Sequence, residues 1–260
     1  MSDIQPWAQV FIEDNRAGNG YAVPWDAIPT IEEAYAVQDA VLDGLAGDRG
    51  ELAGYKVAVT AQPMQEALGL TEPLGGLIHG GQLRSSGCSL SMADFVAPAL
   101  EFEVTVRLAS DVPTDKGLFD RSSIAPYVGE VMSSFELVDP RGADVATVGA
   151  AGLVADRCLS EGAILGAPVT DWSSLDLANC AVELDWNGAT IETGVTGAAM
   201  GHPFEGLAWV ANHMASRGRF LRAGDVVLTG SVFGPKPVAA GDQVTYRISG
   251  LGEVSVSVSA

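Results

Sequence analysis

The most informative stretch of the chain reads Pro98-Ala99-Leu100-Glu101-Phe102-Glu103-Val104-Thr105-Val106. Successive side chains of a β-strand point to opposite faces, so in a strand Glu101 and Glu103 share one face while Leu100 and Phe102 point into a core. Two adjacent carboxylates repel each other unless a cation lies between them, and oxygen-only ligand sets suit Mg²⁺, Mn²⁺ or Ca²⁺. The stretch therefore allows two interpretations, a divalent-metal site or a strand with an ordinary solvated face.

From about residue 94 the sequence consists of short apolar runs separated by turn residues, which is typical of a β-rich body. Asn187-Gly188 lies between two such runs and is the strongest short hairpin signal. Apolar side chains in residues 204–216 recur at helical spacing and predict one amphipathic helix. The expected strands cover residues 54–59, 100–108, 133–138, 161–165, 180–186, 189–193, 225–229, 243–248 and 253–258.

Two helices are expected before the first strand, over residues 3–18 and 30–46. Thr30 followed by Glu33 forms a capping box at the start of the second helix. A short helix over 63–68 and a Gly-rich loop over 72–82 follow the first strand. We therefore expect an N-terminal helical flank over residues 1–50 and a β-rich catalytic body over 51–260, which together can count as one domain.

Composition narrows the class of protein. A chain of 260 residues that is 47% hydrophobic can bury a sizeable core. Its formal net charge of -19, from 33 acidic and 14 basic residues, argues against nucleic acid or an anionic membrane as a partner. The N-terminus lacks the basic and apolar regions of a signal peptide, and no run of about 18 apolar residues occurs. We therefore expect a cytoplasmic protein.

Several common site types are absent from the sequence. Cys88, Cys158 and Cys180 are too widely spaced for a disulfide framework or a structural zinc site. Ser160 has no histidine at a recognisable spacing and no nucleophile elbow, which disfavours a serine hydrolase. No Walker A or dinucleotide fingerprint occurs between a strand and a helix.

Further motifs accompany the paired glutamates in a specific order. They are Thr30-Ile31-Glu32-Glu33-Ala34-Tyr35-Ala36-Val37-Gln38, Gly54-Tyr55-Lys56-Val57-Ala58-Val59-Thr60, Phe135-Glu136-Leu137-Val138-Asp139-Pro140-Arg141, Val154-Ala155-Asp156, Gly201-His202-Pro203, Ala208-Trp209-Val210-Ala211-Asn212, residues 223–231 and Ala240-Gly241-Asp242. Through them the chain resembles, over nearly its whole length, the 2-keto-4-pentenoate hydratase and 4-oxalocrotonate decarboxylase branch of the fumarylacetoacetate hydrolase superfamily.

This resemblance implies an α+β fold, a mixed β-sandwich or roll with flanking helices and an N-terminal helical segment. It implies Mg²⁺ or Mn²⁺ held by Glu101, Glu103 and Glu136, and a short 2-oxo acid or its enol as substrate. Lys56 corresponds to the active-site lysine of the branch, as an acid, a base or a partner for the substrate carboxylate. Asp156 is expected to orient Lys56 or a water. Family members form rings or stacked dimers, so we expect a homo-oligomer, with a paired pathway enzyme as a further candidate partner.

The sequence departs from the branch at three places. His79 and Gly80 stand where hydratases usually have two acidic residues, so His79 is a candidate catalytic group and the general acid or base is left open. Ala99 replaces a common arginine. Arg157 replaces the usual asparagine and is a candidate to bind a second substrate carboxylate. Substrate contacts are expected from Leu100, Phe102, Arg157, Ser160, Thr229 and Ser231.

Four functions remain open from the sequence. The first is a metal-dependent hydratase that adds water to a 2-hydroxy-2,4-dienoate in the breakdown of aromatic compounds. The second is a decarboxylase of a 2-oxo-alkenedioate, for which Arg157 is the one supporting residue. Hydrolytic C–C cleavage ranks third because no Glu-His pair is apparent. The fourth is a non-catalytic member that binds a 2-oxo acid or stabilises an active homologue.

Overall fold

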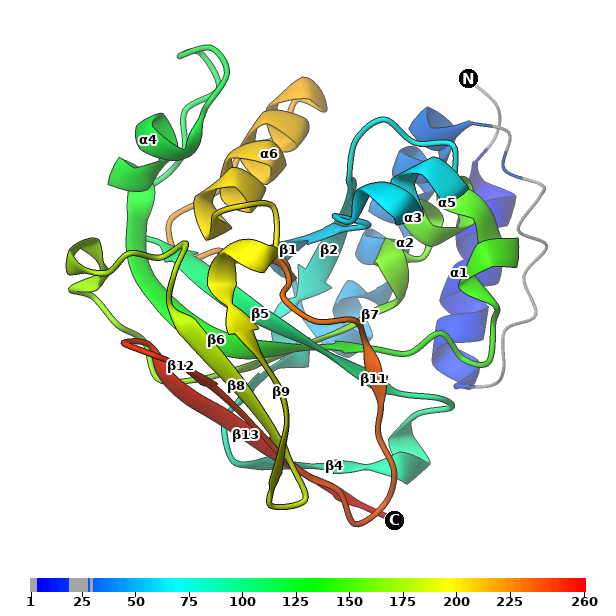
Figure 1. The fold of residues 1–260 in the computed structure, drawn as a ribbon. Coiled ribbons are helices and arrows are strands. Elements are labelled where there is room, and N and C mark those ends of the chain that lie inside the picture. Colours follow the sequence, from blue (N-terminus) through cyan, green and yellow to red (C-terminus); the bar gives the residue numbers. More distant parts are fainter. Residues whose placement is uncertain (1–3, 19–27, 29) are drawn as a thin grey trace.

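The computed structural model describes residues 4–18, 28 and 30–260, which form two β-sheets flanked by helices (Figure 1). The helices are α1 (Gln5–Ala17), α2 (Ile31–Arg49), α3 (Gln62–Ala67), α4 (Arg121–Ile124), α5 (Val145–Ala155) and α6 (Pro203–Ser216). Short 3₁₀ turns cover Gly80–Gln82, Met92–Asp94, Ala125–Tyr127, Arg157–Leu159, Trp172–Ser174 and Thr196–Ala198. Among the described residues no helix has the length and apolar character that a membrane crossing needs.

The larger sheet has the strand order β2-β1-β10-β5-β6-β7-β3, and β11 also pairs with β5. Its strands are β1 (Leu52–Ala58), β2 (Leu74–His79), β3 (Leu83–Ser85), β5 (Ala99–Leu108), β6 (Val128–Val138), β7 (Ser160–Leu165), β10 (Val226–Ser231) and β11 (Lys236–Pro237). β2 at one end of this sheet contacts β7 near the other end, which shows that the sheet is strongly curled. The hollow side of this sheet is where side chains from distant strands meet.

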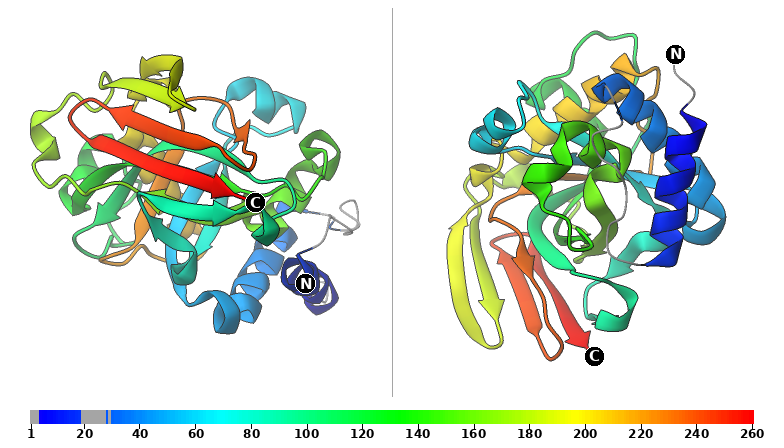
Figure 2. Two further views of the ribbon diagram at one scale, coloured as in Figure 1. Left: turned by 90° about the horizontal axis from the view of Figure 1, so that it is seen from below. Right: turned by 90° about the vertical axis from the view of Figure 1, so that its right-hand side faces the viewer.

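The second sheet has the order β4-β13-β12-β8-β9 and is seen face-on in the left view of Figure 2. Its strands are β4 (Cys88–Ser91), β8 (Ala181–Trp186), β9 (Ala189–Val195), β12 (Gln243–Ile248) and β13 (Gly252–Ser259). The expected hairpin joins β8 and β9. Asn187 and Gly188 have φ of 54° and 83°, as a two-residue turn with both central residues left-handed requires.

The main core lies between the two sheets. Phe102 of β5 is fully buried there, with its ring centroid 5.8 Å from that of Phe135 on β6 and 5.8 Å from that of Tyr246 on β12. A second apolar cluster joins α1, α2 and α5, which Figure 1 shows gathered on one side of the larger sheet. Thr30 caps α2 by accepting a hydrogen bond from the Glu33 N–H at 3.1 Å.

The predicted fold class is confirmed, and each expected strand coincides with an observed one. Residue 3 of the first expected helix lies outside the described residues, and the division of the chain at residue 50 stays a prediction. The Gly-rich loop expected over 72–82 is wrong, because residues 74–79 form the fully buried strand β2. The glycines of this strand allow other segments to pack closely against it. A Cβ on Gly75, for example, would lie 3.0 Å from the His213 ring. The sequence also missed α4, α5, β3, β4 and β11.

Candidate metal centre and active site

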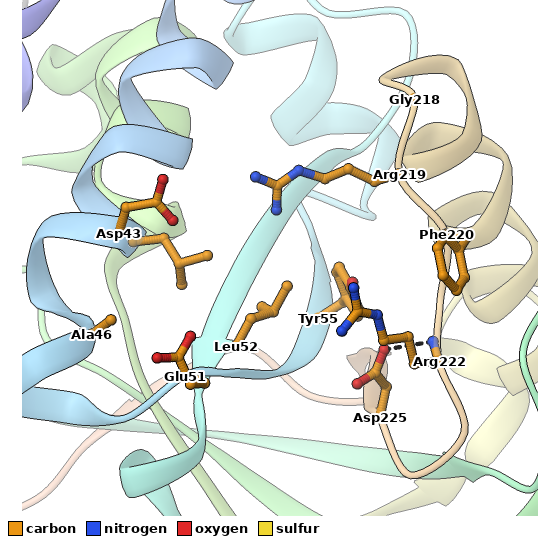
Figure 3. A pocket seen from close by; sticks show the side chains of 11 residues that line it. Asp43, Ala46, Glu51, Leu52, Tyr55, Gly218, Arg219, Phe220, Arg222 and Asp225 are labelled. Atoms are coloured by element: carbon orange, nitrogen blue, oxygen red, sulfur yellow. Dashed lines mark hydrogen bonds between the residues drawn. The ribbon is translucent and has the colours of Figure 1, made fainter.

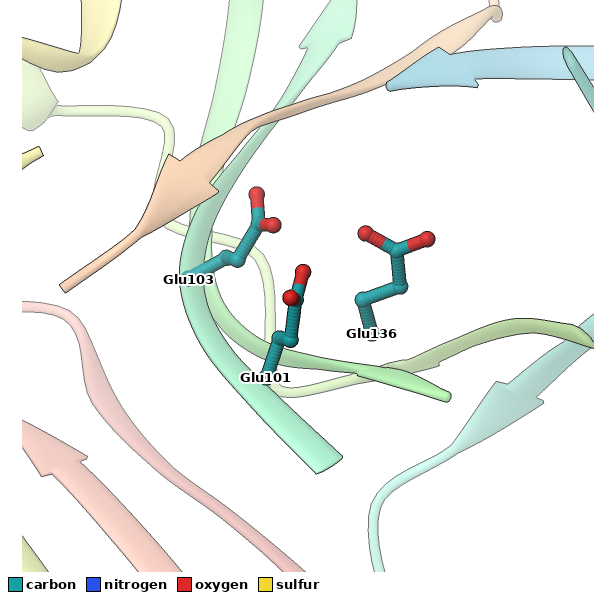
Figure 4. A group of neighbouring side chains, drawn as sticks. All are labelled: Glu101, Glu103 and Glu136. Atoms are coloured by element: carbon teal, nitrogen blue, oxygen red, sulfur yellow. The ribbon is translucent and has the colours of Figure 1, made fainter. Parts of the chain in front are cut away.

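Three glutamates converge on the hollow side of the larger sheet. Glu101 and Glu103 lie two residues apart on β5 and share a face, and Glu136 on β6 is the direct cross-strand partner of Glu101. One carboxylate oxygen of each lies within 4.8 Å of the others. Figure 4 shows the carboxylates pointing into the same space. The predicted ligand set is therefore brought together by two neighbouring strands.

The glutamate cluster is buried and short of hydrogen bonds. Glu103 and Glu136 have no exposed surface, Glu103 Oε1 and Glu136 Oε2 accept no hydrogen bond from the described residues, and Glu136 Oε1 lies beside the Lys56 ammonium. Burial raises the pKa of Glu103 well above its usual range, with further contributions from Glu136 and Glu101. Burial likewise raises the pKa of Glu136 to about 7. Buried, oxygen-only ligands with open lone pairs fit a hard divalent cation.

Lys56 reaches this cluster from β1, three strands away from β6 in the sheet order. Its Nζ lies 2.7 Å from Glu136 Oε1, although three strand spacings in a flat sheet amount to roughly 14 Å. Burial lowers the pKa of Lys56, but the Glu136 and Glu101 carboxylates outweigh burial, so the pKa is raised. The two carboxylates thus favour the ammonium form of Lys56; of the roles expected from the sequence, this form suits an acid or a partner for the substrate carboxylate better than a base.

The Thr229-Gly230-Ser231 segment supports the cluster through its main chain. The Gly230 N–H donates to Glu103 Oε2 at 2.7 Å. The Thr229 hydroxyl donates to the Val104 carbonyl, and the Ser231 hydroxyl accepts from the Phe102 N–H, both at 2.7 Å. The two hydroxyls are therefore engaged with strand β5, and the expectation that they are presented to a substrate is not supported.

Two further substrate contacts expected from the sequence belong to the core instead. The side chains of Leu100 and Phe102 are fully buried between the sheets, on the face of β5 opposite Glu101 and Glu103. Ser160 lies nearer the cluster: its hydroxyl accepts from the Gly162 N–H at 3.3 Å and helps to lower the pKa of the Glu136 carboxyl. A substrate contact by Ser160 stays a prediction.

His79 is not part of a loop and does not reach the cluster. It is the last residue of β2, fully buried, with Nε2 3.0 Å from the Leu42 carbonyl oxygen. Lys56 pairs with Gly76, three residues earlier on β2, which places His79 roughly 10 Å along the strand. Burial lowers the pKa of its imidazole. The position of His79 therefore gives no support to the catalytic role expected from the sequence.

Asp156 and Arg157 lie in a buried ionic network behind the cluster. The Asp156 carboxylate accepts hydrogen bonds from Asn15 at 2.9 Å and from Arg141 at 2.6 Å, and no ion pair joins it to Lys56. The Arg157 guanidinium donates to Asn15 Oδ1 at 2.6 Å and to the Ser160 carbonyl at 3.3 Å. Neither residue is exposed. Arg157 is therefore not placed to bind a substrate carboxylate, and Asp156 does not contact Lys56.

Sequence reasoning missed the left-handed turn that follows Asp156. Arg157, Cys158 and Leu159 have φ of 54°, 54° and 63°, a conformation that costs a residue with a side chain on the order of 1–2 kcal/mol. Cys158 packs against β2, with Sγ 3.6 Å from the Gly75 carbonyl oxygen, and burial raises the pKa of its thiol to about 12. Three such residues in a row need strong support from their surroundings. No Gly or Asn marks this turn in the sequence.

A separate groove of about 480 Å³ lies between α2, the start of β1 and the segment after α6 (Figure 3). Arg219 and Arg222 line one wall, and Asp43 and Glu51 lie across from them. Tyr55, which also lines the groove, neighbours Lys56 on β1 and points to the opposite face of the sheet. The groove is therefore distinct from the glutamate cluster.

Comparison with known proteins agrees with the geometry. Residues 91–259 match the fumarylacetoacetate (FAA) hydrolase C-terminal family. The chain is also 31% identical to the 2-hydroxyhexa-2,4-dienoate hydratase of Comamonas testosteroni over 98% of both chains. The chain belongs to the fumarylacetoacetate hydrolase family. Within this family it is 30% identical to the 2-keto-4-pentenoate hydratase of Paraburkholderia phymatum, over 87% of this chain and 85% of the relative.

A solved member of the fumarylacetoacetate hydrolase family has the same fold. The 4-oxalocrotonate decarboxylase from Pseudomonas putida G7, complexed with calcium and acetate, superposes with a TM-score of 0.87 at 25% identity. The match covers 98% of this chain and 96% of that chain. The likeness includes the N-terminal helices as well as the two sheets.

Proposed function

We propose that the protein is a metal-dependent hydratase, a lyase that adds water to a 2-hydroxy-2,4-dienoate to give a 4-hydroxy-2-oxo acid in aromatic catabolism. The observation that carries this proposal is the convergence of Glu101, Glu103 and Glu136 beside the Lys56 ammonium. Hydratase relatives at about 30% identity over most of the chain support the reaction class.

The metal proposed for the site is Mg²⁺ or Mn²⁺, held by Glu101, Glu103 and Glu136. With all groups ionised, three carboxylates and one ammonium leave two negative charges, which a divalent ion balances. When bound, such an ion supplies Lewis-acid stabilisation, worth several kcal/mol, for the negative charge that develops on the oxygens of a 2-oxo acid.

Lys56 supplies positive charge from the protein itself. Its ammonium lies beside Glu136 and carries a proton, so it is suited to orient an anionic substrate and to donate a hydrogen bond. The hydration sequence we propose begins with protonation to the conjugated 2-oxo-3-enoate, followed by attack of water at C4. The Gly230 N–H holds the Glu103 carboxylate in place through its hydrogen bond to Oε2.

The distribution of cations favours hydration over decarboxylation. A dicarboxylate substrate needs a second cationic group, and all 14 Lys and Arg residues of the chain lie in the described residues. Arg157, the one candidate for this role, is buried and bound to Asn15 and the Ser160 carbonyl. The decarboxylase stays the second candidate because of the fold match to 4-oxalocrotonate decarboxylase.

Hydrolytic C–C cleavage has no support in the described residues. None of the three histidines pairs with a glutamate: His79 contacts the Leu42 carbonyl, His202 caps α6 through the Phe204 N–H, and His213 stacks on Trp209. A homo-oligomer, a paired pathway enzyme and a cytoplasmic location stay predictions.

One assay separates the candidate functions. The pure protein is incubated with Mg²⁺ and enzymatically generated 2-hydroxypenta-2,4-dienoate, and ultraviolet absorbance is followed with and without EDTA. EDTA-sensitive decay to a 4-hydroxy-2-oxo acid supports the hydratase, whereas CO₂ release from the dicarboxylate homologue supports the decarboxylase. Calorimetric binding of the dienoate without turnover supports a non-catalytic protein and contradicts the proposed hydratase.

A further inference from the structure

The left-handed turn Arg157–Leu159 and the Lys56 side chain both pack against Gly76 of β2. A Cβ on Gly76 would lie 2.7 Å from the Arg157 carbonyl oxygen and 2.8 Å from Lys56 Cγ, so the turn, β2 and the Lys56 side chain are in contact around this glycine. Cys158 Sγ contacts the neighbouring Gly75 carbonyl. A shift of this turn would therefore change the surface against which the Lys56 side chain packs.

The Arg157 guanidinium ties the two ends of the turn together. It lies 3.9 Å from the Asp156 carboxylate, which precedes the turn, and donates to the carbonyl of Ser160, which follows it. It also donates to Asn15 Oδ1 of α1, and Glu161 Oε1 lies 3.9 Å away. The Arg157 guanidinium is fully buried, and its contacts with these partners stabilise the unfavourable left-handed backbone of residues 157–159.

The same turn leads into the glutamate cluster. Ser160 comes directly after Leu159 and is the cross-strand partner of Val138 on β6, two residues from Glu136, the ion-pair partner of Lys56. The turn thus packs near Lys56 around Gly76 and leads directly into β7, the strand that pairs with β6 at Glu136.

We propose that Arg157 is a positioning residue for the Lys56–Glu136 pair, acting by holding the left-handed turn Arg157–Leu159 against Gly75 and Gly76. Its effect on turnover rests on the proposed hydratase function, whereas its effect on the Lys56 side chain does not. An arginine with only a structural role would support the stability of the protein without controlling Lys56.

The first test reads Lys56 directly and needs no activity. Lys56, Lys116 and Lys236 are the only lysines of the chain, so mass spectrometry after timed reductive methylation follows each one. In Arg157→Met we expect Lys56 to lose protection by at least about ten-fold relative to Lys116, because local opening governs labelling of a buried group. Leu45→Ala, in the core of the helical cluster, is the control for general loss of stability. Equal labelling of Lys56 in wild type and folded Arg157→Met would overturn the proposal.

The second test separates positioning from stability by kinetics. We expect kcat of Arg157→Met to fall by about 10- to 100-fold, as for a misplaced catalytic group. In a Lys56→Ala background the same substitution should change kcat little but still lower Tm, and Arg157→Lys should restore part of the loss. Independent, multiplicative losses in the double variant would contradict the proposal. An inactive wild type would refute the hydratase function and leave the labelling test decisive.

Asn15→Ala provides a second variant if Arg157→Met does not fold. It removes the partner that accepts from the guanidinium at 2.6 Å and leaves Arg157 in place. We expect the same direction of change in Lys56 labelling, and unchanged labelling in this folded variant would count against the proposal.

Discussion

Glu101 and Glu136 are direct cross-strand partners on β5 and β6, so two carboxylates face each other across an antiparallel pair. Like charges in this position destabilise a sheet, typically by about 0.2–1 kcal/mol at an ordinary site, and here Glu103 adds a third. A divalent cation bound between these carboxylates would remove the repulsion.

Glu101→Gln is therefore expected to abolish Mg²⁺ binding and hydratase activity while leaving the metal-free protein folded and at least as stable as wild type. The substitution removes one ligand and one repulsive charge together. Calorimetric titration with Mg²⁺ and Tm in EDTA measure the two effects. Glu130→Gln on β6, whose cross-strand partner is Arg107, is the matched control. Full activity of Glu101→Gln would refute the metal assignment.

Lys56→Met is expected to destabilise the metal-free protein by about 3–5 kcal/mol, because it leaves the buried Glu136 carboxylate without its ion-pair partner. Urea denaturation in EDTA measures the free energy of unfolding. A second substitution, Glu136→Gln, should recover most of that loss by removing the uncompensated charge. If the double variant is as unstable as Lys56→Met, the pair does not account for the effect.

Thr229→Val tests whether the Thr229 hydroxyl is structural. It removes the buried hydrogen bond to the Val104 carbonyl and should lower the free energy of unfolding by about 1–3 kcal/mol, with KM unchanged. Denaturant titration and steady-state kinetics on the same preparation give both numbers. A raised KM with unaltered stability would restore the substrate contact expected from the sequence.

His213 is expected to make stability fall in mild acid. Burial lowers its pKa to about 4, with a smaller contribution from Arg217, whereas in the unfolded chain the imidazole titrates at its ordinary 6.5. Its contribution is fully present above pH 6.5 and is lost as the pH falls toward 4, because the unfolded state then binds the extra proton.

His213→Gln should remove this part of the pH dependence, on the order of 1–2 kcal/mol after allowance for partial exposure of the ring. The free energy of unfolding is measured at several pH values between 7 and about 4.5, above the range in which most carboxylates titrate. Identical slopes for wild type and variant would show that His213 does not contribute.

The sequence predicted best where side-chain alternation alone determines the outcome. Because residues 99–108 form a strand, Glu101 and Glu103 necessarily share a face. Asn187-Gly188 likewise predicted the hairpin turn between β8 and β9. β2 was missed because Gly75 and Gly76 read as loop residues, although they are small so that His213, Lys56 and the turn can pack against them. Local sequence does not reveal a close approach from a distant segment.

Side-chain roles that depend on distant partners were harder to predict. Arg157 looked like a substrate-binding cation because its partner Asn15 lies far away in the sequence and its left-handed backbone has no residue signal. Thr229 and Ser231 looked like ligand contacts because nothing in the sequence shows that β5 carbonyl and amide groups engage both hydroxyls. The convergence of Glu136 with Glu101 and Glu103 could be predicted only because the resemblance supplied Glu136.

The parallel pairing of β1 with β10 determines when, during synthesis of the chain, the two sides of the site can come together. Residues 54–56 pair with residues 226–228, so the strand that carries Lys56 gains this neighbour only after most of the polypeptide has been synthesised. Such long-range pairing is slow to form. A nascent chain can therefore contain all three glutamates well before the strand that carries the lysine has gained this neighbour.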